Sequence, residues 1–190
     1  MFILYSLVVG ILLGLLLRGR LSGLAELSFR WSTVMLAGLL VQIVLFSPLI
    51  ADRVGAWGPP VYVGSTALVF LAVARNYAIR GVPLVLLGAC SNFAAIVANG
   101  GYMPASASAL AAAHGGVGAL PPGYSNSTVV PDPALGPLTD IFALPAWLPA
   151  ANVFSIGDVL IGAGVIAVIV LAMRRKTIAQ ASPDQHTTPA

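Results

Sequence analysis

The segment 152–173 reads NVFSIGDVLIGAGVIAVIVLAM, and it decides the fold class of the chain. From residue 155 to residue 173 it contains one charged side chain, that of Asp158, in an otherwise apolar run. A helix needs about 20 predominantly apolar residues to cross the hydrocarbon core of a bilayer. The segment therefore predicts a transmembrane helix, and the carboxylate near its start calls for a physical reason.

The composition of the whole chain points to the same class. The 190 residues are 58% hydrophobic and only 8% charged, whereas soluble domains carry about 25% charged residues. Four further apolar runs follow the same pattern, and the five predicted spans are 2–17, 32–50, 60–75, 82–98 and 155–173. The third run is short, so a re-entrant segment is the alternative for it. We predict an all-α, polytopic bundle of five transmembrane helices in a single membrane domain, 1–176.

The basic residues give the orientation of this bundle. If all five runs cross, most of the basic residues fall on one side, namely Arg18, Arg20, Arg30, Arg75, Arg80, Arg174, Arg175 and Lys176. Arg53 falls on the other side. Because Lys and Arg accumulate in cytoplasmic loops, the N-terminus is predicted outside and the C-terminus in the cytoplasm, with a disordered polar tail over 177–190. Topology thus accounts for the formal net charge of +3, and no nucleic-acid partner is predicted.

The predicted outside loop, 99–154, lacks Lys and Arg, which suits a translocated segment. Its middle part, 105–137, is rich in Ala, Gly, Ser and Pro, a composition that packs poorly and turns often. Within it, ASALAAAH at 107–114 can form two helical turns that the following glycine pair would end. The loop leaves the fourth span and returns to the fifth at one membrane face, so a site is expected between those helix ends. No motif in the chain predicts a metal or a cofactor.

The tetrapeptide SIGD, 155–158, offers a reason for the carboxylate. It matches the capping box, in which the Ser155 side chain accepts from a first-turn amide and Asp158 accepts from the Ser155 N–H. A carboxylate in the first turn also gains about 0.3–1 kcal/mol from the helix dipole. Ionisable residues at membrane depth are, however, functional candidates. Two interpretations of Asp158, structural cap and functional acid, therefore stand side by side.

The motif NGGYMP, 99–104, ends the fourth span and also has two interpretations. In the first, Asn99, Gly100 and Gly101 form a helix stop, because glycine adopts the left-handed conformation there and Pro104 prevents the helix from resuming. In the second, the paired glycines expose their backbone amides to a ligand or to a carboxylate.

A stripe of small and amide side chains runs along the fourth span. Gly88, Asn92 and Asn99 share one face at helical spacing. Such a stripe is first a helix-packing surface, because small residues permit close approach and Asn bonds across helices. Gln42 in the second span is the candidate partner.

A second acid, Asp140, lies in LTDIF, 138–142, outside every predicted span and in a segment expected to lie along the membrane interface. Two carboxyls on one membrane face, Asp140 and Asp158, could form a paired-acid site, so both are candidate catalytic residues. The candidate ligand-binding residues are Asn92, Asn99, Gly100, Gly101, Tyr102, Met103, Asp140, Asn152, Ser155 and Asp158.

Taken together, NGGYMP and LTDIF…NVFSIGDVLIGAG resemble an uncharacterised family of bacterial membrane proteins, known as a domain of unknown function. The resemblance implies a five-span protein of the bacterial cytoplasmic (inner) membrane with no assigned activity. A weaker similarity links 138–164 to the last block of the lipoprotein signal peptidases, which are aspartic intramembrane peptidases. It implies that Asn152 and Asp158 take the places of that block's Asn and catalytic Asp. The stretch between the two is longer here, and the family's second catalytic aspartate has no counterpart.

The leading functional hypothesis is a non-enzymatic binding or assembly protein with a polar pocket on its outer face, at the ends of the fourth and fifth spans. Its expected partners are membrane lipid and a partner membrane protein or a second copy of the chain. The alternative is an aspartic-type hydrolase that uses Asp158 and Asp140. A third hypothesis is a subunit of a larger complex that pairs through the GxxxG pattern of Gly10 and Gly14.

Overall fold

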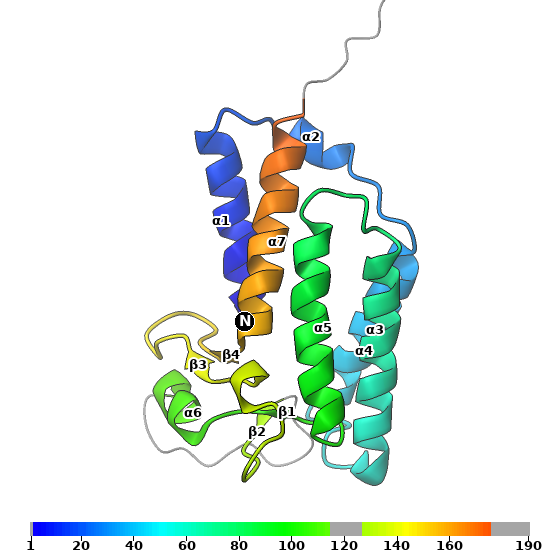
Figure 1. Cartoon of the computed structure of the whole chain (residues 1–190), viewed down its shortest axis with the longest axis vertical. Helices are drawn as coiled ribbons and strands as arrows, with labels where there is room; N and C mark the ends of the chain where they lie inside the picture. Colours follow the sequence, from blue (N-terminus) through cyan, green and yellow to red (C-terminus); the bar gives the residue numbers. More distant parts are fainter. Residues whose placement is uncertain (1, 115–126, 176–190) are drawn as a thin grey trace, which may run out of the picture.

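The computed structural model of the chain describes residues 2–114 and 127–175, and these are mostly helical (Figure 1). The α-helices are α1 (Phe2–Leu16), α2 (Ser22–Ala25), α3 (Ser32–Leu45), α4 (Gly58–Ala74), α5 (Val82–Ala98), α6 (Ala107–His114) and α7 (Ile156–Met173). The other described elements are η1 (Gly55–Trp57), η2 (Gly136–Leu138), β1 (Met103–Pro104), β2 (Ser127–Thr128), β3 (Phe142–Ala143) and β4 (Val153–Phe154). The helical class is confirmed, and the short strands are an addition that hydropathy did not predict.

The five long helices lie side by side in the order α1, α7, α5, α4, α3 (Figure 1). Among the described residues, two helical segments are long and apolar enough to cross a membrane, Gly55–Ala74 and Ile156–Met173, and they suggest membrane association. The helices α1, α3 and α5 are apolar but shorter. The third run, which is short in the sequence, thus belongs to one of the two longest helical segments.

The ends of α3 and α4 differ from the predicted limits. α3 ends at Leu45, before the predicted end at residue 50, because Pro48 has no N–H to continue the helical hydrogen bonds. The Ser47 hydroxyl instead donates to the Val44 carbonyl oxygen at 2.7 Å. The chain then turns and enters α4 at Gly58, two residues before the predicted start at residue 60.

Glycines allow α7 to pack closely against α5. A Cβ added at Gly88 of α5 would lie 2.3 Å from the carbonyl oxygen of Gly157 in α7. Directly before the start of α5, a Cβ added at Gly81 would lie 2.8 Å from the carbonyl oxygen of Gly164. Such distances leave no room for side chains. The two helices therefore contact each other backbone to backbone at both ends of their interface.

The opposite face of α7 packs against α1 in the same way. A Cβ added at Gly162 would lie 2.4 Å from Ser6 Oγ, and one added at Gly14 would lie 2.3 Å from Met173 Sδ. Gly10 faces α7 as well. The GxxxG pattern of Gly10 and Gly14 is therefore occupied within the chain, so it does not supply the free pairing face that the third hypothesis expects.

Residues 99–114 and 127–155 form a unit at one end of the bundle, which we call the cap (Figure 1). In the cap β1 pairs with β2 in parallel, and β3 pairs with β4 in antiparallel orientation. α6 confirms the two helical turns predicted from ASALAAAH, and its buried alanines pack with Val153. In the described part of the Ala/Gly/Ser/Pro-rich stretch, α6 is helical and the backbone of β2 pairs with β1. The predicted glycine stop at 115–116 and the tail 177–190 lie outside the described residues.

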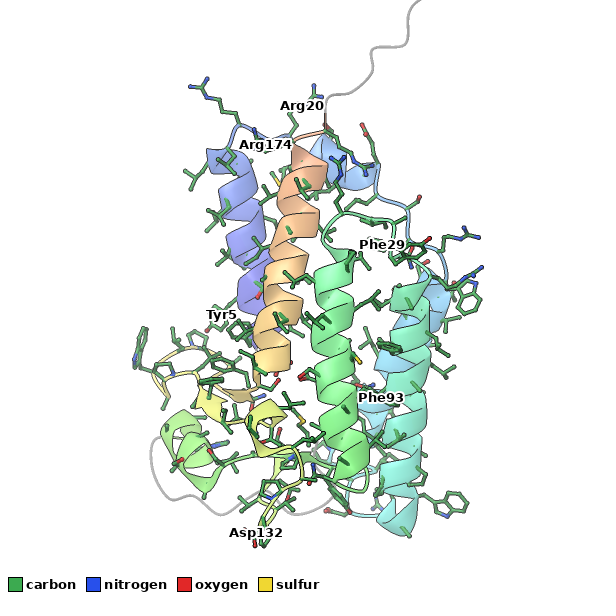
Figure 2. The ribbon with its side chains drawn as sticks, viewed as in Figure 1. Tyr5, Arg20, Phe29, Phe93, Asp132 and Arg174 are labelled. Carbon is green, nitrogen blue, oxygen red and sulfur yellow. The ribbon has the colours of Figure 1, made fainter. Side chains whose placement is uncertain are left out.

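The charged side chains separate along the length of the bundle. Figure 2 shows Arg20 and Arg174 at the end opposite the cap, whereas Asp132 lies in the cap. We call the end opposite the cap the basic end. Its described basic residues are Arg18, Arg20, Arg30, Arg75, Arg80, Arg174 and Arg175.

Candidate functional site

The predicted capping box is present at the start of α7. Ser155 Oγ accepts a hydrogen bond from the Asp158 N–H at 3.0 Å, and Asp158 Oδ2 accepts one from the Ser155 N–H at 3.0 Å. The Ser155 side chain is fully buried. These reciprocal bonds satisfy two of the backbone amides that the first turn of a helix leaves without partners.

Asn92 of α5 connects this capping box to the neighbouring helix. Its Nδ2 donates to Asp158 Oδ1 at 2.9 Å, and its Oδ1 accepts from the Ser155 hydroxyl at 2.7 Å. The contact depends on Gly157, because a Cβ added there would lie 1.9 Å from Asn92 Oδ1. The side chains of Asn92, Ser155 and Asp158 thus form one closed set of hydrogen bonds between α5 and the start of α7.

These contacts favour the structural interpretation of Asp158. Each of its carboxylate oxygens accepts at least one hydrogen bond, so the charge is held by fixed donors. The packing interpretation of the Gly88–Asn92 stripe is confirmed in the same contacts. The partner predicted for that stripe was wrong, since Gln42 Nε2 donates instead to Thr66 Oγ1 of α4 at 3.2 Å.

The Asn99-Gly100-Gly101 sequence acts as a helix stop. Gly100 has a φ of +67° and Gly101 a φ of +89°, backbone conformations that suit glycine. The Gly101 N–H donates to the Ile96 carbonyl oxygen at 2.9 Å, and the Gly100 N–H donates to that of Val97 at 3.3 Å. This is the Schellman pattern of helix ends. Both amides serve helix carbonyls, so the interpretation in which they are exposed to a ligand finds no support.

The Asn99 side chain fastens the cap to the end of α5. Its Oδ1 accepts from the Ala134 N–H at 2.9 Å, and its Nδ2 donates to the Ala134 carbonyl oxygen at 2.9 Å. One side-chain amide therefore pairs with both backbone groups of a residue that lies far away in the sequence. Gly101 adds a close contact with the start of α4, where an added Cβ would lie 2.5 Å from Pro59 Cβ.

The last two residues of the candidate set in NGGYMP are packing residues. Met103 is 5% exposed and belongs to an apolar cluster that α3, α4 and α5 share. Tyr102 packs against the same cluster, whose other buried members are Leu45, Tyr62, Ala95 and Ile96.

Asp140 is buried inside the cap, whereas the sequence placed it in a segment along the membrane interface. Its N–H donates to the Pro104 carbonyl oxygen at 2.9 Å, and its own carbonyl oxygen accepts from the Ser106 N–H at 3.0 Å. Its carboxylate Oδ2 accepts from the Ser127 hydroxyl at 2.7 Å. The residue is 5% exposed. It therefore joins β1, the start of α6 and β2 at one point.

The burial of Asp140 changes its acidity. Desolvation raises the pKa of Asp140 from its ordinary value of 3.8 to about 7; the hydrogen bond from Ser127 lowers it in part, and the negative charge of Asp158 raises it further. The two carboxyls are thus near enough to repel each other. Within the described residues no hydrogen bond joins them, and each has a serine hydroxyl of its own.

The aspartic hydrolase finds no support in this geometry. Paired-acid catalysis needs two carboxyls that act on one substrate, but Asp158 is bound into the first turn of α7 and Asp140 into the cap. Asn152 contributes its backbone carbonyl oxygen, which accepts from the Leu144 N–H at 2.9 Å. Among the described residues no group of three or more His, Cys, Asp and Glu side chains could hold a metal ion.

Two residues whose side chains connect distant parts of the chain, Ser127 and Asn76, were absent from the candidate set. Ser127 lies in a stretch whose composition gives no sign of a partner for Asp140. Asn76 follows the end of α4. Its Oδ1 accepts from the Arg30 N–H at 2.7 Å, and its Nδ2 donates to the Arg30 carbonyl oxygen at 2.8 Å. The position of Asn76 in the sequence could have identified it. Asn76 lies two residues after the end of α4, much as Asn99 directly follows α5.

Replacing Asp158 tests the role assigned to it. We expect Asp158→Ala to lower the free energy of unfolding by about 3 kcal/mol, because the Ser155 N–H and the Asn92 amide lose their acceptor. We expect Asp158→Asn to cost less than about 1 kcal/mol, because rotation of the Asn92 amide restores complementary donors and acceptors. Thermal unfolding of the purified protein in detergent measures both.

The double variant Asn92→Ala/Asp158→Ala provides the control for this result. If the two side chains act as one set, the double variant loses less stability than the sum of the single variants, by about 1 kcal/mol or more. Strict additivity would show that Asp158 and Asn92 are independent.

Most of the chain matches a known family model. The model described as "Family of unknown function (DUF5317)" matches residues 26–170, which include α3, α4, α5, the cap and nearly all of α7. No curated protein and no solved structure is found to match the chain.

Proposed function

The chain belongs to the family of unknown function DUF5317, and on the geometry of its two ends we propose that it is a multi-pass protein of the bacterial cytoplasmic membrane that acts by binding membrane lipid. It binds through the cap and performs no catalysis. A partner membrane protein is the other candidate for the same face.

The sides of the bundle support a membrane setting. α1, α3, α4 and α5 contain no Asp, Glu, Lys or Arg, and α7 contains Asp158 alone in its first turn. Large apolar side chains on the outer helices point away from the protein interior, for example Leu4, Val8, Leu12, Leu36, Leu40, Ile43, Leu68 and Leu71. Exposing such an apolar surface to water costs free energy, whereas contact with the hydrocarbon of a bilayer does not. The absence of charge from every helix interior is what multi-pass insertion requires.

The short helices α1 and α3 are compatible with a membrane setting. α1 and α3 have 15 and 14 residues, which gives about 21–23 Å at 1.5 Å per residue, less than the roughly 30 Å of a hydrocarbon core. A bilayer thins locally around short segments at a modest cost. Tryptophans stand at the helix ends, with Trp31 before α3 and Trp57 before α4. Aromatic side chains of this kind anchor proteins in both membrane interfaces.

The basic end supports an orientation with the cap outside. Seven of the described arginines lie at that end, and Arg53 lies at the cap end. Under the positive-inside rule the basic end faces the cytoplasm. The N-terminus of α1, which lies beside the cap (Figure 1), is then outside, and the end of α7 is inside.

One observation carries the assignment to binding. Trp147, between β3 and β4, is 80% exposed, although the cap around it is firmly held. The Tyr5 hydroxyl of α1 donates to the Pro149 carbonyl oxygen at 2.5 Å, and the Phe154 ring stacks on that of Phe2 at 4.6 Å between centroids. A rigid hairpin that presents an aromatic side chain next to a lipid-facing helix is a contact surface. Two acids at this end, Asp140 and Asp158, are each hydrogen-bonded to a serine hydroxyl, which favours binding over catalysis.

Quenching of Trp147 fluorescence tests this proposal. A variant that keeps Trp147 as its only tryptophan (Trp31→Phe, Trp57→Phe) is placed in nanodiscs made with or without lipids brominated on their acyl chains. We expect bromine near the headgroup end of the chain to quench Trp147, and iodide in the buffer to quench it weakly. Strong quenching by iodide with none by bromine would place the hairpin in water and reject lipid binding by the cap.

A further inference from the structure

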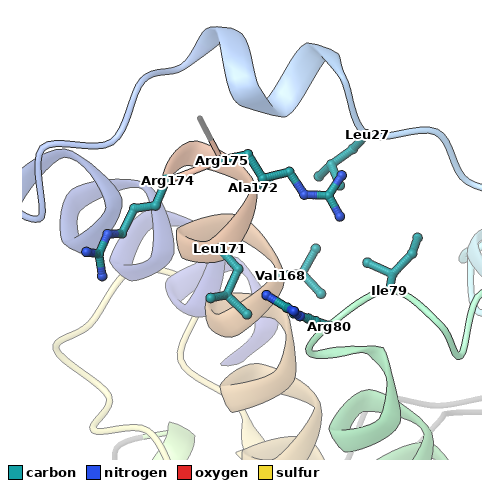
Figure 3. Close-up of a pocket in the computed structure, with 8 residues that line it drawn as sticks. All are labelled: Leu27, Ile79, Arg80, Val168, Leu171, Ala172, Arg174 and Arg175. Atoms are coloured by element: carbon teal, nitrogen blue, oxygen red, sulfur yellow. The ribbon is translucent and has the colours of Figure 1, made fainter. Parts of the chain in front are cut away.

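A pocket of about 220 Å³ lies at the basic end, remote from the cap (Figure 3). It is formed by the last turns of α7, the connection between α4 and α5, and the connection between α2 and α3. Its lining residues are Leu27, Ile79, Arg80, Val168, Leu171, Ala172, Arg174 and Arg175. Neither the capping box nor the cap takes part in it.

Two glycine contacts hold the walls of this pocket in place. A Cβ added at Gly81 would lie 2.8 Å from the backbone nitrogen of Val168, so the start of α5 rests directly on α7 and carries Arg80 with it. A Cβ added at Gly23 would lie 2.3 Å from the Ala172 carbonyl oxygen, so α2 rests on the end of α7. The pocket is therefore fixed by backbone packing on two sides.

Two exposed arginines from different elements, Arg80 and Arg175, line the pocket. Figure 3 shows Arg80 and Arg175 on the side of α7 that faces Ile79 and Leu27, whereas the guanidinium of Arg174 extends to the other side, toward α1. In the described part of the chain, the guanidinium groups of Arg80 and Arg175 make no hydrogen bond or ion pair. Two unpaired positive charges beside one apolar wall form a surface that attracts an anion.

The surroundings leave that positive charge largely uncompensated. The end of α7 carries the negative end of a helix dipole, but several of its last carbonyls are already occupied. The Met173 carbonyl oxygen accepts from the Arg20 N–H at 2.8 Å, and that of Ala172 accepts from the Arg175 N–H at 3.2 Å. One acid, Glu26, precedes Leu27 in the chain and is exposed. The helix dipole, at most about half a unit charge, does not neutralise two guanidinium groups.

We infer that this pocket binds a phosphate group, held by Arg80 and Arg175 against the apolar wall of Leu27, Ile79 and Val168. Guanidinium groups recognise phosphate oxygens through paired N–H donors. The pocket is smaller than the roughly 300–1,000 Å³ typical of sites for drug-sized ligands, so it suits a headgroup or a small phosphorylated molecule. Basic pockets at the cytoplasmic ends of transmembrane helices are suited to anionic lipid headgroups, and that source follows from the membrane orientation proposed above.

Stability in the presence of defined ligands tests the inference. The probes are phosphatidylglycerol, phosphatidylcholine and inorganic phosphate, each added to the purified full chain in a neutral detergent. The test variant is Arg80→Gln/Arg175→Gln, which removes both of these positive charges. Arg18→Gln is the matched control, because it removes an exposed charge of the same basic end that does not line the pocket. At saturating phosphatidylglycerol we expect the unfolding midpoint of the unmodified protein to rise by about 5 °C or more over phosphatidylcholine.

The outcomes separate the possible sources of the phosphate group. The inference predicts that the double variant binds phosphatidylglycerol about tenfold more weakly or worse, while Arg18→Gln binds it normally. If inorganic phosphate gives the same rise and the double variant abolishes it, the ligand is a soluble phosphate compound. An equal loss in Arg18→Gln would show that net charge alone attracts the lipid and would overturn the inference. The inference would also be overturned if neither phosphatidylglycerol nor inorganic phosphate raised the unfolding midpoint of the unmodified protein.

Discussion

Replacing Asp140 with asparagine is expected to stabilise the protein at pH 8 and to remove most of the pH dependence of its stability. In the folded chain the carboxyl is buried with the Ser127 hydroxyl as its hydrogen-bond donor. Asparagine keeps an oxygen that accepts from Ser127, and it removes the charge that burial disfavours.

The sign of the pH effect follows from the direction of the pKa shift. Because the folded protein holds the pKa of Asp140 near 7 rather than 3.8, it binds this proton more tightly than the unfolded chain does. The stability contributed by the protonated form is fully present below about pH 4 and is lost as the pH rises through about 7. By pH 8 the loss is on the order of 4 kcal/mol, or about 10 °C in the unfolding midpoint.

Unfolding midpoints measured in detergent between pH 4 and pH 8 check this prediction. The unmodified protein should lose stability across that range, and Asp140→Asn should change far less. Asp132→Asn is the matched control, because Asp132 is an exposed acid of the same cap. If Asp140→Asn and Asp132→Asn gave the same pH profile, Asp140 would not be the buried acid that the structure describes.

The second large effect is expected at Gly157. A Cβ at this position would lie 1.9 Å from Asn92 Oδ1 and 2.8 Å from the Gly88 carbonyl oxygen. Asn92 can move away only by giving up its hydrogen bonds to Ser155 and Asp158, and the Gly88 backbone can move only if α5 separates from α7. We expect Gly157→Ala to lower the free energy of unfolding by about 3 kcal/mol.

Gly64→Ala is the matched control for this substitution. Gly64 lies in the interior of α4, is exposed, and would place a Cβ with nothing within 4 Å. The same chemical change is expected to be neutral or to stabilise by up to about 1 kcal/mol, because alanine favours the helix more than glycine does. Thermal unfolding of the two variants compares them directly. Equal effects at the two positions would show that the α5–α7 contact is looser than described.

The sequence predicted the helices and the start of α7 because both leave local signals. Apolar runs marked all five long helices, and Ser155 with Asp158 at capping-box spacing predicted the hydrogen bonds that the structure contains. The close packing of α5 also followed from the spacing of Gly88 and Asn92. The end of α3 was misplaced because hydropathy was given more weight than Pro48.

The arrangement of the helices and the interior of the cap leave no such signal. Helices that are apolar on all sides do not show which neighbour they contact, so the placement of α7 between α1 and α5 was not predicted. Strands of two residues have no periodicity to detect. The burial of Asp140 depends on Ser127, which lies across a stretch of low complexity. Nothing in the neighbourhood of either residue in the sequence predicts that they meet.

The orientation of the chain in a membrane is the central claim, and labelling of single cysteines tests it most directly. Cys90 is the only cysteine, so a Cys90→Ser background accepts one new cysteine at a time. Ser108→Cys places the thiol on the exposed face of α6 in the cap, and Ser28→Cys places it in the exposed connection between α2 and α3 at the basic end. Both are treated with a membrane-impermeant maleimide in intact bacterial spheroplasts and again after lysis.

We expect the cysteine at position 108 to react in intact spheroplasts and the cysteine at position 28 to react only after lysis. That result would place the cap outside, the basic end in the cytoplasm and the bundle across the membrane. Reaction of both cysteines in intact spheroplasts, or of position 28 alone, would contradict the account.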